Sequence, residues 1–101
     1  MELPIPIDRE KISAFCGRWK VVELSLFGSV LRDDFGPTSD VDVLVTFAAD
    51  AEWGLWDLVE MRDELRELIG REVDLVERGA LRNPFRERAI LRERRVIHAA
   101  C

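Results

Sequence analysis

Residues 28–45 read GSVLRDDFGPTSDVDVLV, a turn-rich loop that leads into an apolar run interrupted by aspartates. The run from Val41 to Phe47 is rich in β-branched residues and predicts a strand. Residues i and i+2 of a strand point to the same side, about 6.5 Å apart, so Asp40 and Asp42 should project together. Like charges held this close repel each other unless a cation lies between them. The stretch therefore predicts a strand that carries a divalent-cation site.

The regions around this stretch alternate between helical and strand patterns. Asp8 can cap a helix in which Ile12, Phe15 and Trp19 share one apolar face. The predicted elements, in chain order, are that helix, a strand over 22–26 with one buried face, a short helix over 29–32, the strand over 41–47, a helix over 53–69, a strand over 72–77, a helix over 83–94 and a strand over 96–98.

Asp74 interrupts a second apolar strand, VDLV, in the same way that Asp42 interrupts the first. If the two strands are neighbours, Asp74 completes a cluster of three carboxylates. Hard oxygen ligands of this kind suit Mg²⁺ or Mn²⁺. A calcium-binding EF-hand loop is excluded, because no twelve-residue pattern starting at Asp33 or Asp34 has Gly sixth and Glu twelfth. The plainer alternative is that Asp40 caps a turn and Asp42 lies on an exposed strand face.

The composition predicts one soluble globular domain. The chain has 101 residues, of which 48% are hydrophobic and 35% charged. No apolar run approaches the roughly 18 residues of a membrane span, and the N-terminus lacks the charge order of a signal peptide. Residues 1–81 hold 18 acidic and 9 basic side chains, which argues against non-specific nucleic-acid binding. Cys16 and Cys101 are expected to be reduced thiols, and His98 an ordinary terminal residue.

Gly28 and Ser29 lie where the first predicted strand ends and the short helix begins. Glycine permits close backbone approach, and N–H groups at a helix start form an anion site that a triphosphate can use. Because this pair precedes Ser39-Asp40-Val41-Asp42 and the intrastrand Asp74, the sequence predicts a phosphate cradle that faces a metal cluster.

These residues resemble the minimal nucleotidyltransferase (MNT) domains of the DNA polymerase β-like superfamily. The matching residues are Gly28-Ser29, Arg32, Ser39-Asp40-Val41-Asp42 and Val73-Asp74-Leu75-Val76, and the match runs from about Val22 to the end of the chain. The resemblance implies an α/β (α+β) nucleotidyltransferase fold over residues 1–101, with a small mixed sheet of three to four strands and flanking helices on one side. The implied reaction moves a nucleoside monophosphate from a nucleoside triphosphate to a hydroxyl.

The resemblance also implies a role for each matching residue. Asp40, Asp42 and Asp74 would be catalytic and would hold two Mg²⁺ ions, with Asp74 activating the attacking hydroxyl. The nucleotide-binding residues would be Gly28, Ser29, Arg32 and Ser39. Arg32 would contact the phosphates, or would instead pair with Asp33 or Asp34. Asp33 stands where the family often has glycine, which bears on the geometry of the loop.

The chain has no module for an acceptor, so the acceptor should arrive on another protein. The resemblance implies a cytoplasmic antitoxin that transfers AMP from ATP to a tyrosine of a HEPN-domain toxin, within a homo- or hetero-oligomer. Two alternatives stay open, namely a non-catalytic antitoxin that neutralises its partner by contact and a small-molecule nucleotidyltransferase. The arginine-rich helix is expected to be solvated, with Phe85 and Ala89 facing the core. Trp53 and Trp56 are equally consistent with a core or an interface.

Overall fold

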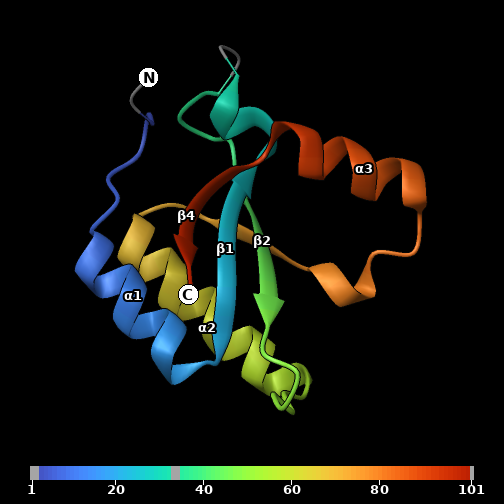
Figure 1. Ribbon diagram of the computed structural model, residues 1–101. Helices are drawn as coiled ribbons and strands as arrows, with labels where there is room; N and C mark the ends of the chain where they lie inside the picture. Colours follow the sequence, from blue (N-terminus) through green and yellow to red (C-terminus); the bar gives the residue numbers. More distant parts are fainter. Residues whose placement is uncertain (1–2, 33–34, 101) are drawn as a thin grey trace.

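The computed structural model describes residues 3–32 and 35–100, in which a four-stranded sheet is flanked by helices (Figure 1). The elements are α1 (Arg9–Arg18), β1 (Val21–Phe27), the 3₁₀ helix η1 (Gly28–Leu31), β2 (Val41–Phe47), α2 (Leu55–Ile69), β3 (Val73–Glu77), the 3₁₀ helix η2 (Arg78–Ala80), α3 (Pro84–Glu93) and β4 (Arg95–Ala99). The strand order is β3-β2-β1-β4; β2 and β3 pair in parallel and the other neighbours are antiparallel. The predicted mixed α+β fold is confirmed. No helix in the described part of the chain is long and apolar enough to cross a membrane.

Local capping determines where the helices begin and end. Asp8 accepts hydrogen bonds from the Glu10 and Lys11 N–H groups at the start of α1, as predicted. Asn83 caps α3 in the same way. Gly70 ends α2 with φ at +79°, a left-handed conformation that glycine adopts without steric cost.

The second long helix begins at Leu55, two residues later than predicted, because Trp53 turns inward before it. The Trp53 indole N–H donates to the Trp19 carbonyl oxygen at 2.8 Å, and the two rings pack edge to face with centroids 5.1 Å apart. Trp53 therefore packs against the core, whereas Trp56 is 80% exposed.

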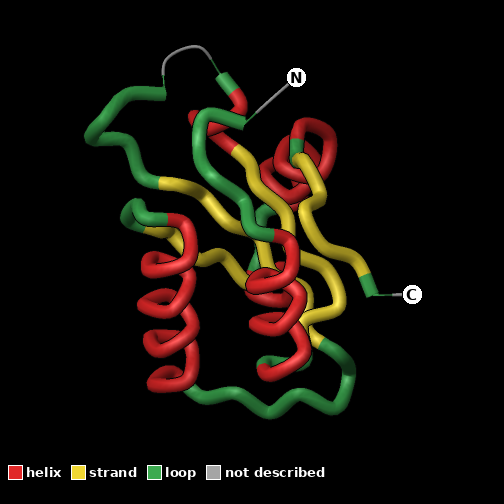
Figure 2. The backbone as a smooth tube through the Cα atoms, turned by 90° about the vertical axis from the view of Figure 1, so that its left-hand side faces the viewer, coloured by secondary structure: helices red, strands yellow, loops and turns green. Residues whose placement is uncertain are grey.

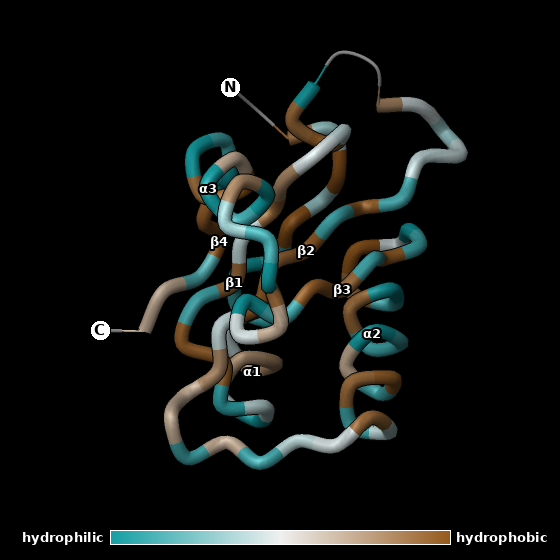
Figure 3. Tube along the Cα trace, turned by 90° about the vertical axis from the view of Figure 1, so that its right-hand side faces the viewer, coloured by the Kyte–Doolittle hydropathy of each residue, from teal (hydrophilic) through white to brown (hydrophobic). Residues whose placement is uncertain are grey.

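The sheet is covered on both faces, and the prediction of helices on one side is wrong. Helices α1 and α2 lie side by side over one face, where they bury the main core (Figure 2). Helix α3 covers the other face and packs Ile90 against Phe27 and Leu44 (Figure 3). The prediction of a single buried face for the first strand is wrong for the same reason, since Ser25 is 0% exposed.

Helix α3 is also turned about its axis relative to the prediction. Phe85 is 77% exposed and Ala89 is exposed, whereas Ile90 is 5% exposed. The sheet-facing stripe is therefore the one that contains Ile90, with Arg86 four residues before it and Glu93 three residues after it. Ile90 packs with Phe27 and Leu44 in one buried cluster, and this apolar contact favours the observed rotation of the helix.

Two leucines of α2 test this assignment of the core. Leu65 is 0% exposed and Leu55 is 72% exposed. We expect Leu65→Ala to lower the free energy of unfolding by about 2–5 kcal/mol, because it removes buried methyl groups and leaves a cavity. The matched control Leu55→Ala should change it by less than about 0.5 kcal/mol. Urea denaturation measures both, and similar losses at the two positions would contradict the packing of α2.

Candidate active site

Two predicted carboxylates meet across neighbouring strands. In the parallel register of β2 and β3, the Cα of Asp42 lies opposite the Cα of Asp74, so the predicted adjacency of the two strands is confirmed. Asp40 lies just before β2, two residues from Asp42. Asp42 is half-buried, whereas Asp40 and Asp74 are exposed. Asp74 is solvated because β3 is an edge strand, so its apolar neighbours in the sequence did not indicate a buried charge.

The environment of Asp42 disfavours its charged form. Burial raises the pKa of the Asp42 carboxyl above its ordinary value, and the negative charges of Asp74 and then Asp40 raise it further. The positive charges of Arg86 and Arg32 lower the same pKa and offset part of this effect. Arg86 was not predicted as a site residue; the only signal in the sequence was the arginine-rich pattern of its helix.

The donor set at this position suits a divalent cation. Carboxylate oxygens are the ligands that Mg²⁺ takes from proteins, and a cation would relieve the repulsion that raises the pKa of Asp42. Within residues 3–32 and 35–100, no three acidic, histidine or cysteine side chains are arranged as a ready-made metal site. A metal would therefore require rotation of carboxylates, which the exposure of Asp40 and Asp74 permits.

Gly28 packs directly against the Asp42 carboxylate. A Cβ atom added to Gly28 would lie 2.2 Å from Asp42 Oδ2, closer than any real contact, and φ of Gly28 is +76°. Both observations require glycine at this position. The Gly28 N–H, predicted to face a phosphate, instead donates to the Glu93 carboxylate at 3.3 Å.

Arg32 and Ser29 lie beside this contact. The Arg32 guanidinium donates to the same oxygen of Glu93 at 3.2 Å. Asp33 and Asp34, the predicted partners of Arg32, lie outside the described residues. Ser29 is half-buried within η1, next to Gly28. The structure thus brings Gly28, Ser29 and Arg32 together on one side of Asp42.

Ser39, a predicted nucleotide ligand, takes part in the loop before β2. Its hydroxyl accepts a hydrogen bond from the Gly36 N–H at 3.0 Å. Arg71 donates to the carbonyl oxygens of Gly36 at 2.6 Å and of Ser39 at 2.8 Å, and its guanidinium lies 4.4 Å from the Phe35 ring centroid. Arg71 therefore holds the loop that delivers Asp40. The sequence offered no signal for this role, since Arg71 is 32 residues from Ser39.

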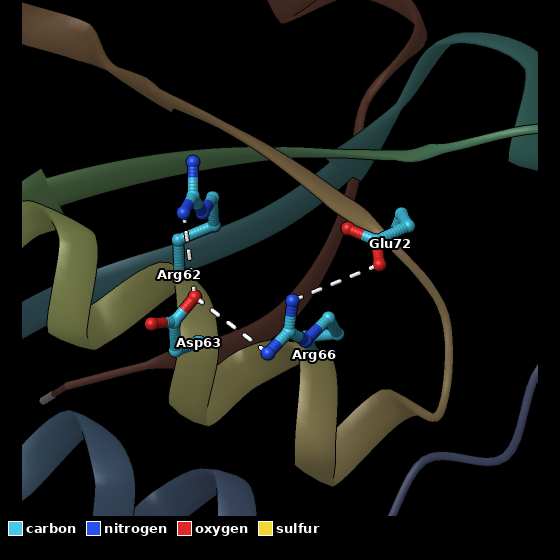
Figure 4. Close-up of polar contacts among 4 residues, drawn as sticks. All are labelled: Arg62, Asp63, Arg66 and Glu72. Atoms are coloured by element: carbon cyan, nitrogen blue, oxygen red, sulfur yellow. Dashed lines mark hydrogen bonds and ion pairs between the residues drawn. The ribbon is translucent and has the colours of Figure 1, made fainter.

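An apolar groove of about 250 Å³ adjoins Asp74, between α2 and the edge strand β3. Its lining residues are Leu55, Leu58, Val59, Arg62, Asp74, Leu75 and Glu77. The charged side of α2 continues beyond Arg62, where Arg66 lies between Asp63 and Glu72 at 3.9 and 3.7 Å (Figure 4). The groove thus borders Asp74, a residue of the candidate site, at the edge of the sheet.

The buried thiol takes no part in this chemistry. Cys16 is 1% exposed in the main core, and burial raises its pKa to about 12. The thiol is therefore protonated at neutral pH and is not a nucleophile. Cys16 is a free thiol, as predicted, whereas Cys101 lies outside the described residues.

A comparison of two glycines can distinguish the effect of the Asp42 contact on stability from the effect of backbone strain. Gly28 and Gly70 have nearly the same positive φ, but an added Cβ at Gly70 meets nothing within 4 Å. We expect Gly70→Ala to cost about 1–2 kcal/mol from strain alone. Gly28→Ala should cost about 1–3 kcal/mol more, because the Asp42 carboxylate must leave its position. Urea denaturation compares the two, and equal losses would show that this carboxylate can rotate aside without cost.

Comparison with known proteins agrees with this geometry. A family described as "Nucleotidyltransferase domain" matches residues 9–97. Protein adenylyltransferase MntA of Thermococcus cleftensis is 36% identical over 76 residues, which are 75% of this chain and 74% of that protein.

Two solved structures have a similar fold at low sequence identity. One is a crystal structure of a toxin–antitoxin with AMP-PNP, with a TM-score of 0.73 and 21% identity over 93% of this chain and 75% of that chain. The other holds tri-AMPylated Shewanella oneidensis HEPN toxin in complex with MNT antitoxin, with a TM-score of 0.65 and 20% identity over 91% of this chain and 70% of that chain. These likenesses show the fold, and the family match shows the enzyme class. The chain therefore belongs to the nucleotidyltransferase domain family, as its resemblance to minimal nucleotidyltransferases predicted.

Proposed function

We propose that this chain transfers AMP from ATP to a tyrosine hydroxyl of a HEPN-type toxin and thereby acts as its antitoxin, with Mg²⁺ as the metal. The observation that carries the proposal is the position of Asp42, opposite Asp74 in the β2–β3 register and in contact with Gly28. This places a pair of carboxylates, which could hold the metal ions used in nucleotidyl transfer, beside a glycine turn. The relatives named as an adenylyltransferase and an MNT antitoxin support the same reaction.

The metal ions would be held by Asp40, Asp42 and Asp74. When bound, two Mg²⁺ ions supply Lewis acidity to the attacking hydroxyl and neutralise charge on the leaving pyrophosphate. The carboxylates themselves position these groups, and Asp74 is the one that the acceptor reaches, because it lies at the open edge of the sheet. Asp74 would orient the acceptor hydroxyl and take up its proton.

The triphosphate would bind on the other side of Asp42. Gly28 lets the turn lie close to Asp42, and Ser29 offers a hydroxyl and a backbone N–H in the same turn. Arg32 and Arg86 both lower the pKa of Asp42, so their positive charges act at this point of the site. Two arginines there would stabilise negative charge on the phosphates as the bond to the leaving group breaks.

The groove beside Asp74 supports a tyrosine as the acceptor. A tyrosine ring is apolar along its length and carries a hydroxyl at its tip. In the groove, the leucines would contact the ring, and the hydroxyl would approach Asp74 at the open edge of β3. Leu55 and Trp56, at the start of α2, are 72% and 80% exposed and extend the apolar surface on which a partner protein would rest.

The variant Asp42→Asn should have opposite effects with and without ligand. Because the pKa of Asp42 is raised in the folded protein, its ionisation destabilises the fold at neutral pH. In the presence of a chelator, Asp42→Asn should be more stable than the wild type at pH 7, and this gain should fade as the pH falls through the raised pKa. Calorimetry should show that Asp42→Asn binds Mg-ATP at least about tenfold more weakly, equivalent to about 1.4 kcal/mol. Equal affinity for Mg-ATP would remove Asp42 from the metal site.

The variant Asp74→Asn separates catalysis from binding. It keeps the shape of the side chain but cannot accept the acceptor proton, so transfer should fall by at least about 100-fold while the complex with the toxin persists. The variant is co-expressed with the toxin, and growth of the cells reports toxicity, which should return. Co-purification reports the complex, and the intact mass of the toxin should show no AMP adduct. The control Asp50→Asn, at an exposed acid that pairs with Lys20, should leave the AMP adduct intact. Protection from toxicity by Asp74→Asn without any adduct would favour the non-catalytic antitoxin.

A further inference from the structure

A single carboxylate oxygen joins the two ends of the η1 turn. Glu93 Oε1 accepts from the Gly28 N–H at 3.3 Å and from the Arg32 guanidinium at 3.2 Å. Gly28 is the first residue of η1 and Arg32 follows its last, whereas Glu93 is the last residue of α3. The contact therefore ties the glycine turn to a helix 65 residues away in the sequence.

The Gly28 N–H needs this partner. The first N–H groups of a helix have no acceptor within the helix, and the residue that precedes η1, Phe27, makes no side-chain capping bond. Gly28 is buried, so water is a poor substitute. Glu93 thus supplies from α3 the capping oxygen that most helices obtain from their own N-cap residue.

Gly28 is consequently held on two sides. Asp42 packs against its Cα, where a side chain would otherwise lie, and Glu93 accepts from its N–H. The same Glu93 oxygen orients Arg32, whose charge acts on Asp42. Ile90 lies one turn before Glu93 on the same side of α3 and anchors that helix in the cluster with Phe27 and Leu44.

We propose, on the basis of the nucleotide site proposed above, that Glu93 is a positioning residue for the nucleotide. Its carboxylate fixes the Gly28 turn and orients Arg32, so that Ser29 and Arg32 face the phosphates before the nucleotide arrives. Preorganisation of this kind increases affinity because the ordering cost is met in the free protein. The opposite role, in which Glu93 imitates a phosphate and is displaced by it, would make removal of its charge tighten nucleotide binding.

The test compares Glu93→Ala and Glu93→Gln with a matched control on the same helix, Glu87→Ala, whose carboxylate pairs with Arg78 at 4.0 Å. In the nucleotide-free protein, hydrogen exchange of the Gly28 amide should be at least about tenfold faster in Glu93→Ala than in the wild type. Glu93→Gln retains a carbonyl oxygen and should keep the wild-type exchange rate. Glu87→Ala should also leave this rate unchanged.

Calorimetry with Mg-ATP at a temperature where all variants are folded gives the second measurement. The dissociation constant should rise about tenfold in Glu93→Ala. It should rise about threefold in Glu93→Gln, which loses the ion pair with Arg32, and should not change in Glu87→Ala. If Glu93→Ala does not fold, Glu93→Gln carries the test by its threefold loss. An unchanged or smaller dissociation constant in the Glu93 variants would overturn the positioning role. A wild-type chain that does not bind Mg-ATP would instead refute the proposed function, and the exchange rates would still report whether Glu93 holds the turn.

Discussion

The candidate site depends on the register between β2 and β3. Val41, Val43 and Val45 face the main core and are each 0% exposed, so Asp42 must face the opposite side of the sheet. A slip of one residue would exchange these sets and place the carboxylate in the core. The hydrophobic pattern that stabilises the sheet therefore also holds Asp42 opposite Asp74. No separate interaction is needed to bring the two acids together.

This arrangement makes ionisation of the Asp42 carboxyl less favourable. It is the acid of the cluster that is half-buried, and the two exposed acids beside it add their repulsion. Asp74 lies on the edge strand β3 and is exposed to solvent. The edge also leaves Asp74 accessible from outside. The half-buried Asp42 is thus suited to hold a cation at a fixed position, and the exposed Asp74 is suited to contact a group that arrives from solvent.

The sequence predicted what local patterns determine. Val41–Phe47 was predicted with the bounds that the structure has, and the cap of α1 followed from Asp8. Contacts between distant segments were not predictable in this way. Glu93 reaches Gly28 across 65 residues and Arg71 reaches Ser39 across 32, and neither arginine-rich nor acidic patterns distinguish these side chains from solvated neighbours.

The rotation of α3 was predicted wrongly, and the observed rotation is the one that brings charged side chains of this helix to the site. A helix with Phe85 and Ala89 inward would turn its stripe of Arg86, Ile90 and Glu93 by about 100° away from the sheet. The observed helix instead buries Ile90 and, on the same stripe, directs Arg86 and Glu93 toward the residues around Asp42. Arg86, Ile90 and Glu93 are spaced by four and three residues and so lie on one side of the helix. A single rotation of α3 therefore buries Ile90 and also places the charges of Arg86 and Glu93 near the site. The layer that closes the second face of the sheet is therefore also the layer that completes the polar surroundings of the glycine turn.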